Sequence, residues 1–80
     1  MGKRLYSDKR EAFRSLIKGV RVSAGLTQAE LSERLGRPQS YVSDYERGHR
    51  RLDWVAVDEV LNACGKTIDE FAREYQRSGL

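Results

Sequence analysis

Apolar residues recur at helical spacing along the whole chain, and no stretch alternates as a half-buried strand does. Helical stretches are followed by glycines at Gly25, Gly36, Gly48 and Gly65. Such glycines commonly end helices, because the C-terminus favours a left-handed backbone conformation that glycine adopts without strain. The pattern therefore predicts a compact all-α fold of five short helices. They are expected over residues 7–24, 27–36, 38–47, 53–64 and 67–77.

The starts of three of these helices carry polar N-terminal caps. Thr27 is followed by Glu30 and Thr67 by Glu70, which is the spacing of a capping box. In this motif the side chain of each residue bonds the backbone of the other. Asp53 stands in the same position before the fourth stretch. We therefore expect the second, fourth and fifth helices to begin directly after these residues.

One face of each predicted helix is apolar, and these faces together supply a single core. On the third stretch the apolar face opposes a polar one, so we expect its two tyrosines and its valine to point inward. Cys64 falls on an apolar face, and we interpret it as a small buried hydrophobe instead of a redox switch. The predicted core residues are Phe13, Leu16, Ile17, Val20, Leu31, Leu35, Tyr41, Val42, Tyr45, Trp54, Val57, Val60, Leu61, Cys64, Ile68, Phe71, Ala72 and Tyr75.

The second and third helices have the size and spacing of a helix-turn-helix. A brief turn at Gly36 and Arg37 separates them, and a short glycine-containing turn sets two helices at a steep angle. In such a unit the second helix enters the major groove of DNA. The outward face of the third helix carries mostly short hydrogen-bonding side chains, which suit the donor and acceptor pattern on base edges. These side chains are Gln39, Ser40, Ser43, Asp44 and Arg47.

The net charge of +3 hides two basic segments. Residues 1–21 carry +5 and residues 47–51 carry +3, whereas the rest of the chain carries −5. One flank of the first helix is basic from end to end, which describes either a solvated face or a contact surface for a polyanion. Its cations are Arg10, Arg14, Lys18 and Arg21. A nucleic-acid site would require the two basic segments to meet in space.

The composition excludes several other classes of protein. Cys64 and His49 are the sole residues of their types, so we expect no disulfide, metal site, cofactor or enzymatic activity. With 80 residues we also expect a single domain, made of a flexible N-terminal arm over residues 1–6 and a folded unit over residues 7–77. Since no apolar run is long enough to span a membrane and none follows the basic residues near the start, we expect neither a membrane span nor a signal peptide. These features favour a cytoplasmic protein.

The helix-turn-helix region combines Leu-Thr-Gln at 26–28, Leu-Gly at 35–36 and Tyr-Glu-Arg-Gly at 45–48. At these spacings it resembles the Cro/C1-type (XRE) helix-turn-helix family of small bacterial and mobile-element regulators. The resemblance extends over about residues 10–75. It implies a compact five-helix, lambda-repressor-like DNA-binding domain with its helix-turn-helix at about residues 27–47.

The resemblance also implies roles for individual positions. Arg21 and Glu46 match a structural ion pair, and Gln28 matches a glutamine that contacts a phosphate and buttresses the recognition helix. The positions that match base-reading residues are Gln39, Ser40, Ser43 and Asp44. Asp44 either accepts from a cytosine amino group or repels the DNA backbone. The candidate backbone contacts are Arg10, Arg14, Lys18, Arg21, Gln28, Tyr41, Arg47, His49, Arg50 and Arg51.

A sequence-specific transcriptional regulator follows from this resemblance. It is expected to bind a palindromic operator as a homodimer and to act at its own promoter. Residues 53–77 are expected to form the dimer face, although core packing explains Phe71 and Tyr75 equally well. The candidate contacts are Leu52, Val55, Phe71, Tyr75 and Leu80. The expected partners are double-stranded DNA, a second copy of the chain and RNA polymerase, in the bacterial nucleoid.

An antitoxin-type interaction module is the alternative. It would neutralise a partner toxin through its own surface, with DNA binding secondary. Such antitoxins usually carry an added disordered or toxin-wrapping segment, whereas residues 1–6 are the main part outside the predicted fold. The regulator is therefore favoured, and a neighbouring toxin gene would reverse this preference.

Overall fold

The computed structural model describes residues 2–78, with side chains from residue 8 onward. In this part of the chain all regular secondary structure is helical, which confirms the predicted five-helix, all-α fold. The helices are α1 (Gly2–Ser23), α2 (Gln28–Leu35), α3 (Gln39–Glu46), α4 (Trp54–Ala63) and α5 (Ile68–Arg77). None of these helices is both long and apolar enough to cross a membrane.

The predicted caps at Thr27, Asp53 and Thr67 are confirmed. The Glu30 amide donates to Thr27 Oγ1 over 3.0 Å, and the Thr27 amide donates to Glu30 Oε1 over 2.8 Å. The same reciprocal bonds join Thr67 and Glu70. The predicted helix-ending glycines all have positive φ angles, from 67° to 84°. Local signals therefore determine where most of the helices begin and end.

The first helix is longer than predicted. It begins at Gly2, so residues 2–6, which were expected as a separate N-terminal arm, continue the helix. Met1 lies outside the described residues. The sequence gives little signal for this start, because the first turn of the helix has no acidic residue.

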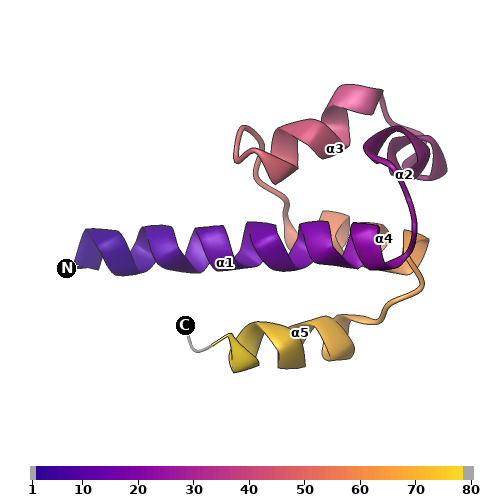
Figure 1. Ribbon diagram of the computed structural model, residues 1–80. Helices are drawn as coiled ribbons and strands as arrows, with labels where there is room; N and C mark the ends of the chain where they lie inside the picture. Colours follow the sequence, from indigo (N-terminus) through magenta and orange to yellow (C-terminus); the bar gives the residue numbers. More distant parts are fainter. Residues whose placement is uncertain (1, 79–80) are drawn as a thin grey trace.

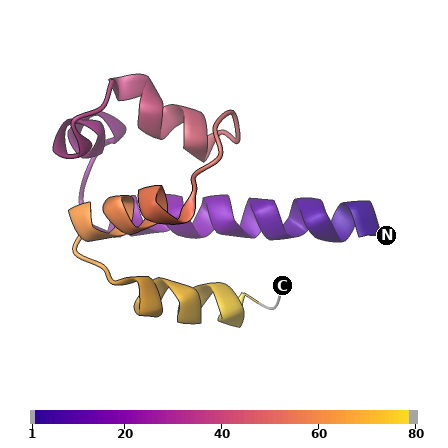
Figure 2. The same ribbon diagram turned by 180° about the vertical axis from the view of Figure 1, so that it is seen from behind.

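The long helix α1 is the central element of the molecule (Figure 1). The pair α2 and α3 lies on one side of it and α5 on the other. Figure 2 shows α4, and the loop that leads into it, in front of α1. Both α3 and α5 contact α1, so the helix-turn-helix is supported directly by the first helix.

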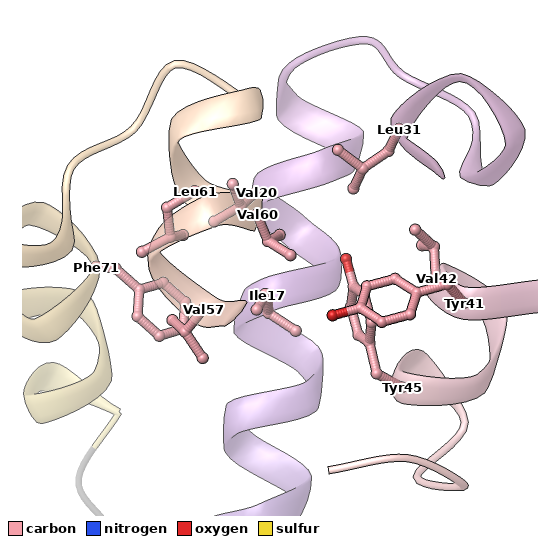
Figure 3. Packing of buried hydrophobic residues seen from close by; sticks show 10 residues of the cluster. All are labelled: Ile17, Val20, Leu31, Tyr41, Val42, Tyr45, Val57, Val60, Leu61 and Phe71. Carbon is pink, nitrogen blue, oxygen red and sulfur yellow. The ribbon is translucent and has the colours of Figure 1, made fainter. Parts of the chain in front are cut away.

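Buried apolar side chains from all five helices form one core (Figure 3). Ile17 of α1 lies at its centre, with the tyrosines of α3 on one side and side chains of α4 and α5 on the other. The inward face predicted for α3 is confirmed. The core residues are Ile17, Val20, Leu31, Tyr41, Val42, Tyr45, Val57, Val60, Leu61 and Phe71. Burying a large apolar side chain stabilises a fold by roughly 1.5–3 kcal/mol, so this cluster holds the helices together.

Contrary to the prediction, Trp54 is not part of this core, since 68% of it is exposed. It is the first residue of α4, and helical side chains lean toward the N-terminus of their helix. The indole therefore extends past the start of α4 instead of packing beneath it. Ala72 was also expected in the core and is exposed. Both residues line a cavity of about 270 Å³ that we call the apolar hollow, together with Phe13, Leu52, Phe71 and Tyr75.

Candidate nucleic-acid interface

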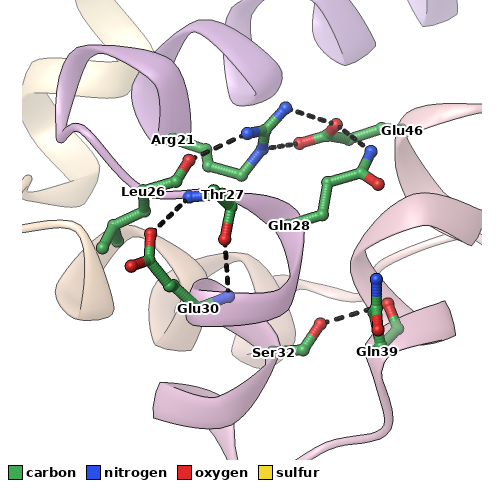
Figure 4. A network of polar contacts seen from close by, with 8 residues as sticks. All are labelled: Arg21, Leu26, Thr27, Gln28, Glu30, Ser32, Gln39 and Glu46. Carbon is green, nitrogen blue, oxygen red and sulfur yellow. Dashed lines mark hydrogen bonds and ion pairs between the residues drawn. The ribbon is translucent and has the colours of Figure 1, made fainter.

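The start of α3 is held by α2 and lies at the surface. Across the turn at Gly36, the hydroxyl of Ser32 donates to the carbonyl of Gln39 over 3.3 Å (Figure 4). The four candidate base-reading residues follow on α3, the first two exposed and the last two half-buried. They are Gln39, Ser40, Ser43 and Asp44. The structure therefore leaves the polar side of α3 open to a ligand.

Asp44 lies beside a cation on the same surface. Its Oδ1 is 3.6 Å from Nη2 of Arg47, one turn further along the chain. Both side chains are partly exposed, so the pair contributes little to stability. The guanidinium instead offsets the negative charge that Asp44 would present to a DNA backbone.

A polar network anchors the other end of α3 (Figure 4). Arg21 Nε donates to Glu46 Oε2 over 2.8 Å and Arg21 Nη2 donates to Glu46 Oε1 over 3.1 Å. Gln28 Nε2 donates to the same Oε1 over 2.9 Å, and Arg21 Nη1 donates to the carbonyl of Leu26 over 2.9 Å. The carboxylate of α3 therefore joins the end of α1 to the beginning of α2. Arg21 and Glu46 are brought together, and Gln28 buttresses α3 through this carboxylate.

Burial separates this network from solvent. The side chain of Arg21 is 10% exposed and that of Glu46 is 3% exposed. The hydrogen bond to Glu46 raises the pKa of the Arg21 guanidinium, which keeps it charged. Neighbouring Tyr45 is also buried, and the burial raises the pKa of its hydroxyl above the usual range. The guanidinium of Arg21 is engaged inside the fold, and its expected phosphate contact stays a prediction.

Tyr41 is also a core residue, since it is only 7% exposed, which agrees with its predicted place on the inward face of α3. Its contact with the DNA backbone stays a prediction. Figure 3 shows its ring pointing from α3 toward α1. The guanidinium carbons of Arg37 and Arg50 lie 4.9 Å and 5.1 Å from the centre of this ring. Sequence reasoning missed Arg37. The signal was available, because Arg37 precedes Tyr41 by four residues at the exposed start of the recognition helix.

The two basic segments meet between α1 and the loop after α3. They surround a cavity of about 550 Å³, which we call the basic hollow. The guanidinium of Arg14 reaches the loop, where a Cβ added to Gly48 would lie 3.2 Å from its Nη1. The cations that line the basic hollow are Lys9, Arg10, Arg14, Arg50 and Arg51.

The remaining predicted cations lie outside this cavity. Lys18 is exposed on α1, and Arg47 and His49 are exposed beside the end of α3. They are not among the residues that line the basic hollow. The basic flank predicted for α1 is thus divided among a buried ion pair at Arg21, an exposed lysine and the two arginines of the hollow.

The candidate dimer contacts fall into different environments. Val55 is 65% exposed, while Leu52 and Tyr75 are half-buried and line the apolar hollow. Phe71 is a core residue, with its ring edge-to-face on Phe13 at 5.8 Å, which favours the core role over the dimer contact for this residue. The candidate Leu80 lies outside the described residues.

Comparisons with known proteins agree with this geometry. Residues 12–73 match the model of a helix-turn-helix domain family. A solved XRE-family like protein from Pseudomonas syringae pv. tomato str. DC3000 is 32% identical, with a TM-score of 0.87 over 96% of this chain and 94% of that one. The clp gene regulator ClgR from C. glutamicum is 27% identical, with a TM-score of 0.75 over 88% of this chain and 90% of that one. No curated protein sequence matches the chain significantly.

Proposed function

Since the chain belongs to the XRE-type helix-turn-helix family of DNA-binding transcriptional regulators, we propose that it recognises a palindromic operator as a homodimer. In this proposal it is not an enzyme, and it acts in the bacterial cytoplasm with its own promoter among its targets. RNA polymerase is the proposed second partner, either blocked or recruited at the operator.

The observation that carries this proposal is the way the rest of the fold supports α3 and leaves its polar side exposed. Its polar start is exposed, its apolar face is in the core, and both of its ends are tied to α2. The ties are the bond from Ser32 to Gln39 and the bond from Gln28 to Glu46. A helix presented in this way can enter a major groove without losing support. Gln39 and Ser40 would then reach base edges.

The proposed phosphate contacts surround this helix. Arg37 lies before its start, and Arg47 and Arg50 lie after its end. All three are exposed, so each can neutralise a phosphate and release counterions from the DNA. Affinity from such contacts is independent of sequence and falls as salt rises.

Selection from random duplex DNA, followed by binding measurements across salt, tests this function. A symmetric site with half-sites about 10 bp apart, or a multiple of this, supports the homodimer. Gln39→Ala should relax preference at one or two base pairs by about 1–3 kcal/mol each. Gln76→Ala is the matched control, because Gln76 is an exposed glutamine on α5. A steep salt dependence without any sequence preference would contradict the proposal.

The dimer face that we propose centres on the exposed side chains of Trp54 and Val55. Two-fold symmetry places the same patch on both copies, so these apolar side chains of the two copies can pack against each other. Sedimentation should show that Val55→Glu dissociates the dimer. Val22→Glu is the matched control, because Val22 is 58% exposed at the end of α1. Equal effects of the two changes would contradict this choice of face.

A further inference from the structure

We propose that the basic hollow is a binding site for a small phosphate ester with an aromatic body, of the nucleoside phosphate class. Its walls come from α1, from α3 and the loop after it, and from α5. Its volume of about 550 Å³ lies within the usual range of small-molecule sites, which is roughly 300–1,000 Å³. The cavity is therefore large enough for a compact ligand.

The charge of the basic hollow selects an anion. Five cationic side chains line it and no aspartate or glutamate does. Arg14 and Arg51, which line it, form no ion pair with a carboxylate of the described residues. A guanidinium presents a planar set of donors that matches the oxygens of a phosphate.

Apolar side chains in the walls of the basic hollow also favour a ligand that has an apolar part. Phe13, Leu52 and Tyr75 line the basic hollow, and the same three residues line the apolar hollow. Contacts to a duplex backbone require cations and hydrogen-bond donors but no aromatic wall. An aromatic ring on the ligand can stack on these side chains while its phosphate bonds the arginines.

Calorimetric titration of the full chain with ADP, inorganic pyrophosphate and adenosine tests the site without DNA. ADP carries both parts of the proposed ligand, pyrophosphate only the charge and adenosine only the ring. We expect ADP to bind about tenfold more tightly than either fragment, since each part of the ligand has its own contacts. Equal affinities for ADP and pyrophosphate, or no binding of ADP, would overturn the proposal.

Variants distinguish the basic hollow from diffuse charge attraction. Arg51→Gln changes an exposed loop residue and should weaken ADP binding about tenfold. Lys18→Gln removes the same charge from α1 outside the hollow, and ADP affinity should not change. Tyr75→Leu keeps an apolar side chain but removes the ring, so it should weaken ADP and not pyrophosphate. If Lys18→Gln weakens ADP binding as much as Arg51→Gln does, the proposal fails.

An effect of the ligand on DNA binding is a separate readout, because it rests on the proposed function. Arg50 and Arg51 line the hollow and are also candidate phosphate contacts. Saturating ADP should therefore weaken duplex binding by the wild-type chain, and Arg51→Gln should reduce this sensitivity. ADP binding by a chain that binds no DNA contradicts the proposed function alone. DNA binding by a chain that binds no ADP contradicts the ligand site alone.

Discussion

Arg14 and Arg21 lie two turns apart on α1, yet the structure uses them in opposite ways. Arg21 is buried, bonded to Glu46 by two of its nitrogens and bonded to a backbone carbonyl by a third. Arg14 is half-buried beside Gly48 and faces the basic hollow. One arginine ties α1 to α3 and to the connection before α2, whereas the other is available to an anion. A basic flank on a helix therefore does not define one functional unit.

The difference arises from what each residue meets across the fold. A buried charge must be paired, so Arg21 and Glu46 depend on each other. A half-exposed charge remains hydrated, and Arg14 can exchange water for a ligand. We therefore expect that removing a charge from the buried pair lowers the free energy of unfolding more than removing the charge of Arg14 does.

Glu46→Ala should have the largest effect, lowering the free energy of unfolding by about 3–5 kcal/mol. It leaves the Arg21 guanidinium buried without its partner and removes the acceptor of Gln28. Chemical denaturation measures this loss. Glu33→Ala, at an exposed position on α2, should cost less than about 0.5 kcal/mol. Similar values for the two variants would show that the ion pair is not structural.

Gly48→Ala should have the next largest effect, destabilising the chain by about 1–2 kcal/mol. Its φ of 84° is unfavourable for alanine, and the added Cβ would press on Arg14. Thermal unfolding gives the value. Gly19→Ala is the opposite case, because Gly19 lies inside α1 with open space around it and should gain about 0.5–1 kcal/mol. A stabilising Gly48→Ala would contradict the role given to this turn.

Arg14→Gln should change stability by less than about 0.5 kcal/mol, because its charge has access to solvent. Its effect should appear in DNA binding, where the slope of log affinity against log salt should decrease by about 1 if Arg14 meets a phosphate. Fluorescence anisotropy with a labelled duplex measures the slope. A stability loss as large as that of Glu46→Ala would remove the distinction between the two arginines.

The capping box of α2 should give the smallest effect, because its carboxylate is exposed. Hydrogen bonds from Thr27 lower the pKa of Glu30 below its ordinary value of 4.5. Because the pKa of Glu30 is lower in the folded chain, its carboxylate stabilises the fold at pH values above its ordinary pKa. This contribution is lost as the pH falls through the pKa of the folded state. Glu30→Gln should therefore reduce the acid sensitivity of unfolding, measured between neutral pH and about pH 3. An unchanged pH profile would contradict this account.

Local features of the fold were predictable and distant ones were not. Thr27 and Thr67 signal their helices through contacts within one turn, so sequence spacing is sufficient. Trp54 falls on the same face of α4 as the core residues. The spacing of apolar residues cannot show that this first position of the helix lies beyond the edge of the core. The start of α1 at Gly2 has little signal in the sequence.

The site shows the same division. The polar face of α3 and the presence of two basic segments followed from composition and spacing. How the cations are shared between an ion pair and a hollow depends on contacts such as Arg21 with Glu46, which are 25 residues apart in sequence. Arg37 was missed because it lies in the turn between two helices, whereas candidate residues were sought on helix faces.

The two ties between α2 and α3 have a mechanical consequence. With bonds from Ser32 and Gln28 fixing both ends of α3, the recognition helix cannot tilt independently to follow a groove of different width. Adjustment must then come from the DNA, and base steps that bend or twist easily lower its energetic cost. In the proposed complex, a rigid reader of this kind would select its operator by the ease with which the duplex deforms as well as by the bases that it touches.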